Sequence, residues 1–155
     1  MSRAQVASAL MLAVLLAGCT VRRAQVAVQA SLTSVADGVQ TATDIVASQV
    51  PPAIPGEGVE AYDARTRAFA QASVAYDVTA SALDALQAAQ DAWVASGSLP
   101  DTWPALCHAL SEGLAALLAA IAAAGVDVPG ALSAAPGAAE SACTIASSFL
   151  GGGGS

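Results

Sequence analysis

Three cysteines and one histidine are the side chains of this 155-residue chain whose types and spacing could do chemistry. Cys107 and Cys143 form an even pair if Cys19 is used elsewhere, and in an exported protein such a pair predicts a disulfide. A bridge across this separation removes unfolded-state entropy worth roughly 3–4 kcal/mol. Two buried free thiols are the alternative reading, because a free cysteine behaves as a small apolar residue.

His108 lies directly after Cys107 and invites a metal site or an activated nucleophile. Adjacent residues of a helix point in different directions, and the chain has no second histidine. No nucleophile elbow of the form G-x-S-x-G, phosphate-binding glycine loop or zinc-binding histidine pair is present, and the acidic residues occur singly. The sequence therefore predicts a protein that is not an enzyme, with no metal and no cofactor.

Cys19 stands at the end of an N-terminal apolar segment. A positive charge at Arg3 precedes this segment, which is densest over residues 9–17, too short for an ordinary membrane span and typical of a secretory signal. It ends in Leu16-Ala17-Gly18-Cys19. These four residues resemble the lipobox of bacterial lipoproteins, which consists of an aliphatic residue, a small residue, Gly or Ala, and Cys.

The resemblance implies that the Cys19 thiol receives diacylglycerol, that residues 1–18 are removed as a signal peptide, and that Cys19 becomes the first residue of the mature chain. Stable anchoring needs at least two acyl chains, and an acylated Cys19 supplies them. An uncleaved anchor helix, or cleavage at an alanine, is the alternative. The expected location is the bacterial cell envelope, and the absence of Asp at residue 20 resembles lipoproteins sorted to the outer membrane, facing the periplasm.

Composition excludes two other classes of function. Five Arg and no Lys stand against 12 acidic residues, so the formal net charge is −7. This balance excludes a conventional nucleic-acid binder and disfavours docking onto an anionic membrane by charge alone. Hydrophobic residues make up 55% of the chain, but much of this is alanine, which brings little area to bury.

Helical periodicity dominates the mature chain. Residues 19–25 are expected to form a lipidated tether in which Arg22 and Arg23 either lie near the bilayer or are simply solvated charges. A first helix is predicted over residues 24–50, ended by Pro51-Pro52, and a second over residues 59–96, ended by Gly97. The first stripe contains Val28, Leu32, Val35, Val39 and Val46.

Two lines of residues with a spacing of seven form a heptad-like seam along the second helix. The first line contains Tyr62, Phe69, Tyr76 and Leu83. The second line starts three residues after Phe69 and contains Ala72, Thr79, Leu86 and Trp93. This seam is interpreted as intramolecular core, with a dimer interface as the alternative. Asp77, Asp84 and Asp91 follow it at intervals of seven. Residues seven apart lie about 10 Å from each other, too far to share one calcium ion, so the row is predicted to face water.

A third helix is predicted over residues 103–124, a broken connection over 127–137 and a short last helix over 138–150. The apolar run from Gly113 to Val126 is shorter than a membrane span and is interpreted as a buried helix, with a membrane-inserted segment as the alternative. Residues 151–155, GGGGS, are predicted to be a flexible tail.

Together these patterns predict an all-α, Ala-rich bundle of about four unequal helices, with a helical domain over residues 26–150. Two functions fit it. The first is a lipid-anchored structural or protein-interaction module whose partners are the membrane, through the lipid on Cys19, and an envelope protein. The second is a ligand-binding or membrane-active small lipoprotein, including one of phage or prophage origin. The sequence leaves the oligomeric state open.

Overall fold

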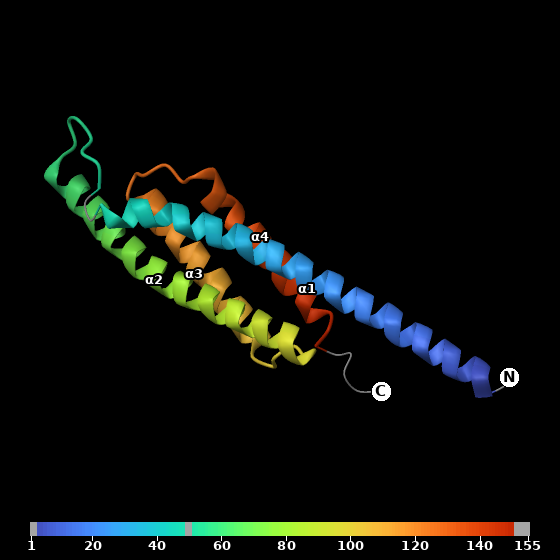
Figure 1. Ribbon diagram of the computed structural model, residues 1–155. Coiled ribbons are helices and arrows are strands. Elements are labelled where there is room, and N and C mark those ends of the chain that lie inside the picture. The colour runs from blue at the N-terminus through green and yellow to red at the C-terminus, as the bar shows by residue number, and fades with distance from the viewer. Residues whose placement is uncertain (1–2, 49–50, 151–155) are drawn as a thin grey trace.

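The computed structural model describes residues 3–48 and 51–150, with residues 3–17 described by their backbone alone. This part of the chain holds four helices and no strand (Figure 1): α1 Arg3–Ala47, α2 Val59–Ser96, α3 Trp103–Ala123 and α4 Gly130–Ser147. The predicted all-α bundle is confirmed. The bounds of α2 are those expected, and α3 ends one residue early.

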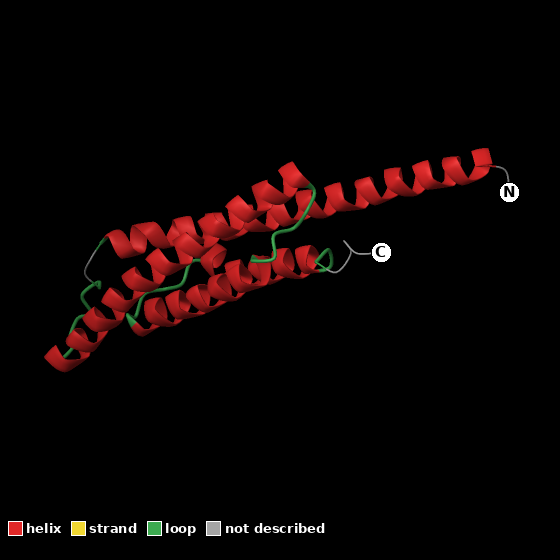
Figure 2. Ribbon diagram, turned by 90° about the horizontal axis from the view of Figure 1, so that it is seen from below, coloured by secondary structure: helices red, strands yellow, loops and turns green. Residues whose placement is uncertain are grey.

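The helices alternate in direction. α1 packs along α4 and α2 along α3, while α1 with α2 and α3 with α4 complete the four contacting pairs. Figures 1 and 2 show the N-terminal part of α1 running past the end of the other three helices. We call this end of the bundle, where residues 97–102 join α2 to α3, the Cys19 end. The opposite end, with residues 51–58 and 124–129, is the distal end.

The core follows the predicted stripes. In α1 four of the five predicted positions are buried, and Val46 is partly buried. In α2 the seam residues are buried within the bundle, as predicted, except that Tyr76 is partly buried and Tyr62 is exposed. The largest fully buried side chains include Trp93, Trp103, Leu86, Leu110, Leu114, Leu117 and Ile121. The acidic residues Asp77, Asp84 and Asp91 are exposed, as expected.

Two glycines allow helices to approach closely. A Cβ on Gly38 of α1 would lie 2.7 Å from the backbone oxygen of Ala131 in α4. A Cβ on Gly113 of α3 would lie 2.7 Å from Oγ1 of Thr79 in α2. These contacts bring each pair of helices nearer than a side chain would permit, and Ala-rich flanks preserve the short distance.

A buried arginine closes the distal end. Arg65 of α2 donates from Nε to the Ala124 carbonyl (2.8 Å), from one terminal nitrogen to Glu57 (2.6 Å) and from the other to the Pro52 carbonyl (2.7 Å). The guanidinium thereby binds the C-terminal end of α3 and the loop that precedes α2. A buried cation must be paired and hydrogen-bonded in this way, because its desolvation is otherwise costly.

The last helix differs from the prediction. We expected a broken connection over 127–137 and a helix from residue 138, whereas α4 begins at Gly130 and contains Pro136. Pro136 removes one backbone donor, but the added turns bury Leu132 and Ala135. Packing of this segment against α1 therefore overrides the local breaking signal. α4 also ends early, so Leu150 lies beyond it and is exposed.

The beginning of the packed domain also differs. Residues 19–25, expected to form a tether, are helical within α1, and Val21 and Ala24 already pack against the core. The packed bundle thus begins at Val21 rather than at residue 26. The expected tail over 151–155 lies outside the described residues, as do the side chains of the expected signal peptide before Gly18.

Candidate functional site

Cys19 lies on the exposed surface of α1, at the boundary where the bundle begins. Gly18, Cys19 and Thr20 are all exposed, and Val21 is the first described side chain packed on the core. The thiol is therefore accessible to a modifying enzyme without any opening of the core. The residues that follow Cys19 hold it close to the folded domain.

Gly18 has no packing role in the bundle. A Cβ built there meets nothing within 4 Å, in contrast to the 2.7 Å contact at Gly38. Glycine in a helix interior costs up to about 1 kcal/mol relative to alanine. Packing of the described side chains therefore does not require a glycine here.

A shallow hollow of about 340 Å³ surrounds Cys19 and is lined by Arg22, Arg23 and Val26. These residues follow Cys19 at intervals of three, four and seven, the spacing that places side chains on one face of a helix. Val26 is 64% exposed. The face thus presents a thiol, two guanidinium groups and an apolar side chain, a combination suited to a lipid with an anionic headgroup.

An aromatic cluster closes the core at the same end. The Trp93 ring makes an edge contact with Trp103 (centroids 6.5 Å apart) and a tilted contact with Phe149 (5.6 Å). Gln25 of α1 donates to the Trp93 carbonyl (3.3 Å), and Gln90 donates to the Gln25 carbonyl (2.9 Å). These contacts fix the start of the packed part of α1 to α2, so Cys19 is attached to a rigid end.

The other two cysteines form the expected disulfide. Cys107 of α3 is bridged to Cys143 of α4, with their Cα atoms 5.9 Å apart. His108 and Glu112 lie away from it as an exposed pair on α3, with His108 Nε2 3.2 Å from Glu112 Oε1. Among the described residues, no group of three or more His, Cys, Asp or Glu side chains could hold a metal ion.

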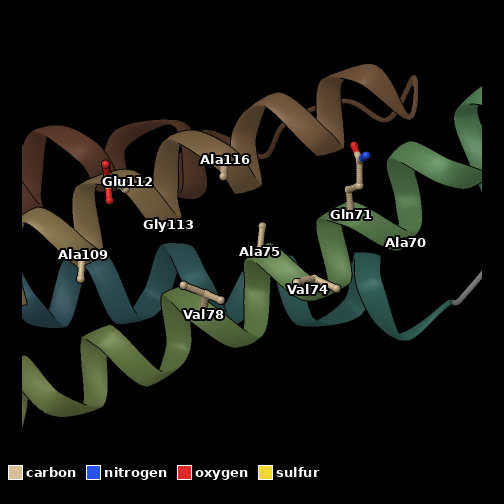
Figure 3. Close-up of a pocket in the computed structure, with 9 residues that line it drawn as sticks. All are labelled: Ala70, Gln71, Val74, Ala75, Val78, Ala109, Glu112, Gly113 and Ala116. Carbon is tan, nitrogen blue, oxygen red and sulfur yellow. The ribbon is translucent and has the colours of Figure 1, made fainter.

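A second surface feature escaped the sequence analysis. An apolar groove of about 640 Å³ runs between α2 and α3 (Figure 3). It is lined by Ala70, Gln71, Val74, Ala75, Val78, Ala109, Glu112, Gly113 and Ala116. The signal that could have revealed it is the recurrence of uncharged residues on the face of α2 next to the predicted core seam.

Comparison of the sequence with protein-family models and with curated proteins, and of the fold with solved structures, finds no match.

Proposed function

We propose that this protein is a lipid-anchored module of a bacterial cell envelope, acylated at Cys19 after removal of residues 1–18. The main support for the proposal is that the expected cleavage site and the start of the packed bundle lie within two residues of each other. The four residues that resemble a lipobox end at Cys19, and packing of the bundle begins at Val21. Cleavage before Cys19 leaves the packed core, from Val28 to Ala146, intact.

The surroundings of Cys19 support the same proposal. Arg22 and Arg23 follow it on α1 and are exposed. Long cationic side chains next to an acylated residue reach headgroup phosphates while their stems lie along apolar surface. A membrane-bound Cys19 would orient the bundle with the α2–α3 turn and the end of α4 near the bilayer and the distal end away from it.

We propose further that the module acts by attachment and contact rather than by catalysis, and that the membrane it occupies is the outer membrane, where it faces the periplasm. The disulfide between Cys107 and Cys143 supports an oxidising compartment. Exposed acidic side chains such as Asp84 and Asp91 recur along α2 among exposed alanines and valines. Such a surface suits contact with an envelope protein.

The second candidate, a membrane-active or ligand-binding lipoprotein, has one observation in its favour. Among the described residues, α3 is the helix long and apolar enough to cross a membrane, with a mean hydropathy of 1.7 over its best window. A core helix meets the same criterion, and Leu110, Leu114 and Leu117 of α3 are fully buried in the core of this bundle. Insertion of α3 would require these leucines to leave the core and would pull on the bridge to α4.

The decisive experiment is expression of the full chain in a bacterial host, followed by mass spectrometry of the membrane fraction. We expect an N-terminal peptide that begins at Cys19 and carries acyl groups. Cys19→Ser should abolish both the acyl mass and the cleavage. As a matched control, the Cys107→Ser/Cys143→Ser variant should keep both, since it removes two thiols and leaves the lipobox unchanged. An unmodified Cys19 in the wild-type protein would overturn the proposal.

A further inference from the structure

A hollow of about 320 Å³ opens at the Cys19 end of the bundle. Its lining comes from the ends of helices and from the turn between α2 and α3: Val21, Trp93, Gly97, Ser98, Leu99, Asp101, Phe149 and Leu150. Figures 1 and 2 show this turn and the end of α4 beside α1, where α1 continues past the other helices. Val21 lies two residues after Cys19, about 3 Å along the helix axis, so a lipid on Cys19 would hold the hollow close to the bilayer surface.

We propose that this hollow binds the ammonium group of an ethanolamine phospholipid in the membrane that carries the protein. The proposal rests on the lipid anchor proposed above, because the anchor is what places the hollow against a bilayer. It adds a second, non-covalent contact with that membrane, one that selects among lipid headgroups.

The lining offers one free carboxylate to a cation. Asp101 is exposed and makes no hydrogen bond or ion pair with another described residue. The arginines nearest to this end, Arg22 and Arg23, line the separate hollow around Cys19. The negative charge of Asp101 is therefore not neutralised by an ion pair within the described part of the chain.

The C-terminal end of α2 adds carbonyl oxygens beside this carboxylate. The last turn of α2 contains no basic residue. In the turn that follows, the Gly97 N–H donates to the Trp93 carbonyl and the Ser98 N–H to Ser96 Oγ. Among the described residues, no N–H group of this turn donates to the carbonyls of residues 94–96. The partial negative charge of the helix end therefore favours a cation at Gly97 and Ser98, which line the hollow.

The positive end of α3 lies near the same turn but has few free donors. The N–H of Trp103, the first residue of α3, donates to the Pro100 carbonyl, and Pro104 has no N–H. Neither Trp103 nor Pro104 lines the hollow. The start of α3 therefore does not offset the negative charge of Asp101 and of the α2 end.

The lining selects an ammonium group that carries N–H donors over a methylated one. A quaternary ammonium group binds to the open faces of aromatic rings. Trp93 is only 1% exposed, and its ring is already in contact with Trp103 and Phe149. The polar groups that remain are oxygen acceptors, and a primary ammonium group has three N–H donors to match them. Ethanolamine therefore fits this lining better than choline.

The surroundings of the hollow fit the rest of such a lipid. Arg22 directly follows Val21 and is exposed, with no partner among the described residues, so its guanidinium can bind the headgroup phosphate. Leu99, Phe149 and Leu150 supply partly exposed apolar surface in the lining. An acidic group is thus available to the ammonium and a basic group to the phosphate, which are the two charges of a zwitterionic headgroup.

The test is native mass spectrometry of the full chain, expressed in a bacterial host, purified in non-ionic detergent and mixed with phospholipids that have identical acyl chains. The headgroups compared are ethanolamine, choline and glycerol. We expect about fivefold more bound ethanolamine lipid than either of the others, the upper range for one exposed ion pair. Equal binding of the three lipids, or a preference for choline or glycerol, would overturn the proposal.

A competition arm identifies the source of the ammonium group. Free ethanolamine at the concentration of the lipid should leave the bound lipid in place, because it lacks the phosphate and the acyl chains. Complete displacement would show that the hollow binds a soluble amine and would refute the lipid as its ligand.

Substitutions test the contacts themselves. Asp101→Asn should reduce the preference for the ethanolamine lipid to at most about twofold, and Asp101→Lys should abolish it. Asp91→Asn is the matched control, because Asp91 is exposed near the end of α2 but does not line the hollow, and it should keep the full preference. Arg22→Gln should weaken the binding of all three lipids to a similar extent, since each carries a phosphate. Circular dichroism should show the same helix content in all four variants. Equal losses of preference in Asp101→Asn and Asp91→Asn would contradict the proposed contact.

The headgroup site and the lipid anchor fail separately. An acylated Cys19 in a protein that shows no headgroup preference would refute the hollow alone. A preference for the ethanolamine lipid in a wild-type protein whose Cys19 is unmodified would refute the anchor alone.

Discussion

The Nε atom of Arg65 in α2 donates a 2.8 Å hydrogen bond to the carbonyl oxygen of Ala124, the C-terminal cap of α3. The same guanidinium binds Glu57 and the Pro52 carbonyl. One buried side chain therefore closes the distal end of the bundle by joining the loop before α2 to the end of α3. The lost hydration of the cation is offset by three partners.

Replacing Arg65 with Met should lower the free energy of unfolding by about 2–4 kcal/mol, because two carbonyl groups and the Glu57 carboxylate lose their partner. Urea denaturation followed by circular dichroism measures the change. Arg67→Met is the matched control: this exposed arginine lies two residues further along α2, and its loss should cost less than about 0.5 kcal/mol. Equal effects of the two substitutions would show that the hydrogen bonds of Arg65 do not stabilise the fold.

Gly125→Ala should destabilise the protein more than Gly97→Ala does. Both glycines have positive φ, +71° and +75°, so each alanine incurs about 1–2 kcal/mol of left-handed backbone strain. A Cβ at Gly125 would also lie 3.0 Å from Nε of Arg65, whereas one at Gly97 meets nothing within 4 Å. We expect thermal denaturation to give a lower Tm for Gly125→Ala. The reverse order would contradict the packing of Arg65 over this turn.

Gly38→Ala should cost about 1–3 kcal/mol, because its Cβ would lie 2.7 Å from a backbone oxygen of α4 and the two helices would have to separate. Gly137→Ala provides the comparison within α4. Nothing lies within 4 Å of a Cβ there, and alanine should stabilise the helix by up to about 1 kcal/mol. Chemical denaturation of both variants should give changes of opposite sign. A neutral Gly38→Ala would mean that α1 and α4 approach less closely than described.

Removing the bridge between Cys107 and Cys143 should lower stability by roughly 3–4 kcal/mol, since it closes a loop with a sequence separation of 36. The double Ser variant and the wild-type chain in reductant should show similar decreases in Tm. Reductant should then have no further effect on the double variant. A Tm that is unchanged by both treatments would contradict the bridge.

The sequence predicts the helix bounds and the buried positions correctly wherever the helical period is unbroken. The bounds of α2 follow from Gly58 before it and Gly97 after it. Its seam is buried from Phe69 to Trp93, except for the partly buried Tyr76, because aromatic, Leu and Ala positions recur every seven residues. The exposed acidic row follows from the same period. The pairing of Cys107 with Cys143 follows from their even number in a chain expected to be exported.

The sequence does not predict features that depend on contacts between helices. Pro136 signals a break, yet α4 begins six residues before it, because Leu132 and Ala135 gain burial against the rest of the bundle. Arg65 lies seven residues before Ala72 on the seam line, unlike the exposed Arg67, but the period does not predict its partners Glu57, Pro52 and Ala124, which come from a loop and a helix end. The groove at Val74 and Val78 depends on how far α2 and α3 stand apart at their outer edge, which no single helix determines.

α1 continues without a break from Cys19 into the bundle, which sets the distance between Cys19 and the distal end of the molecule. α1 is helical without a break from Cys19 to Val21, so no flexible backbone linker separates the thiol from the packed domain. The 38 residues of α2 extend about 57 Å. If the proposed anchor holds the bundle upright, residues 51–58 lie at roughly that height above the bilayer, where they would limit how near another envelope component can come.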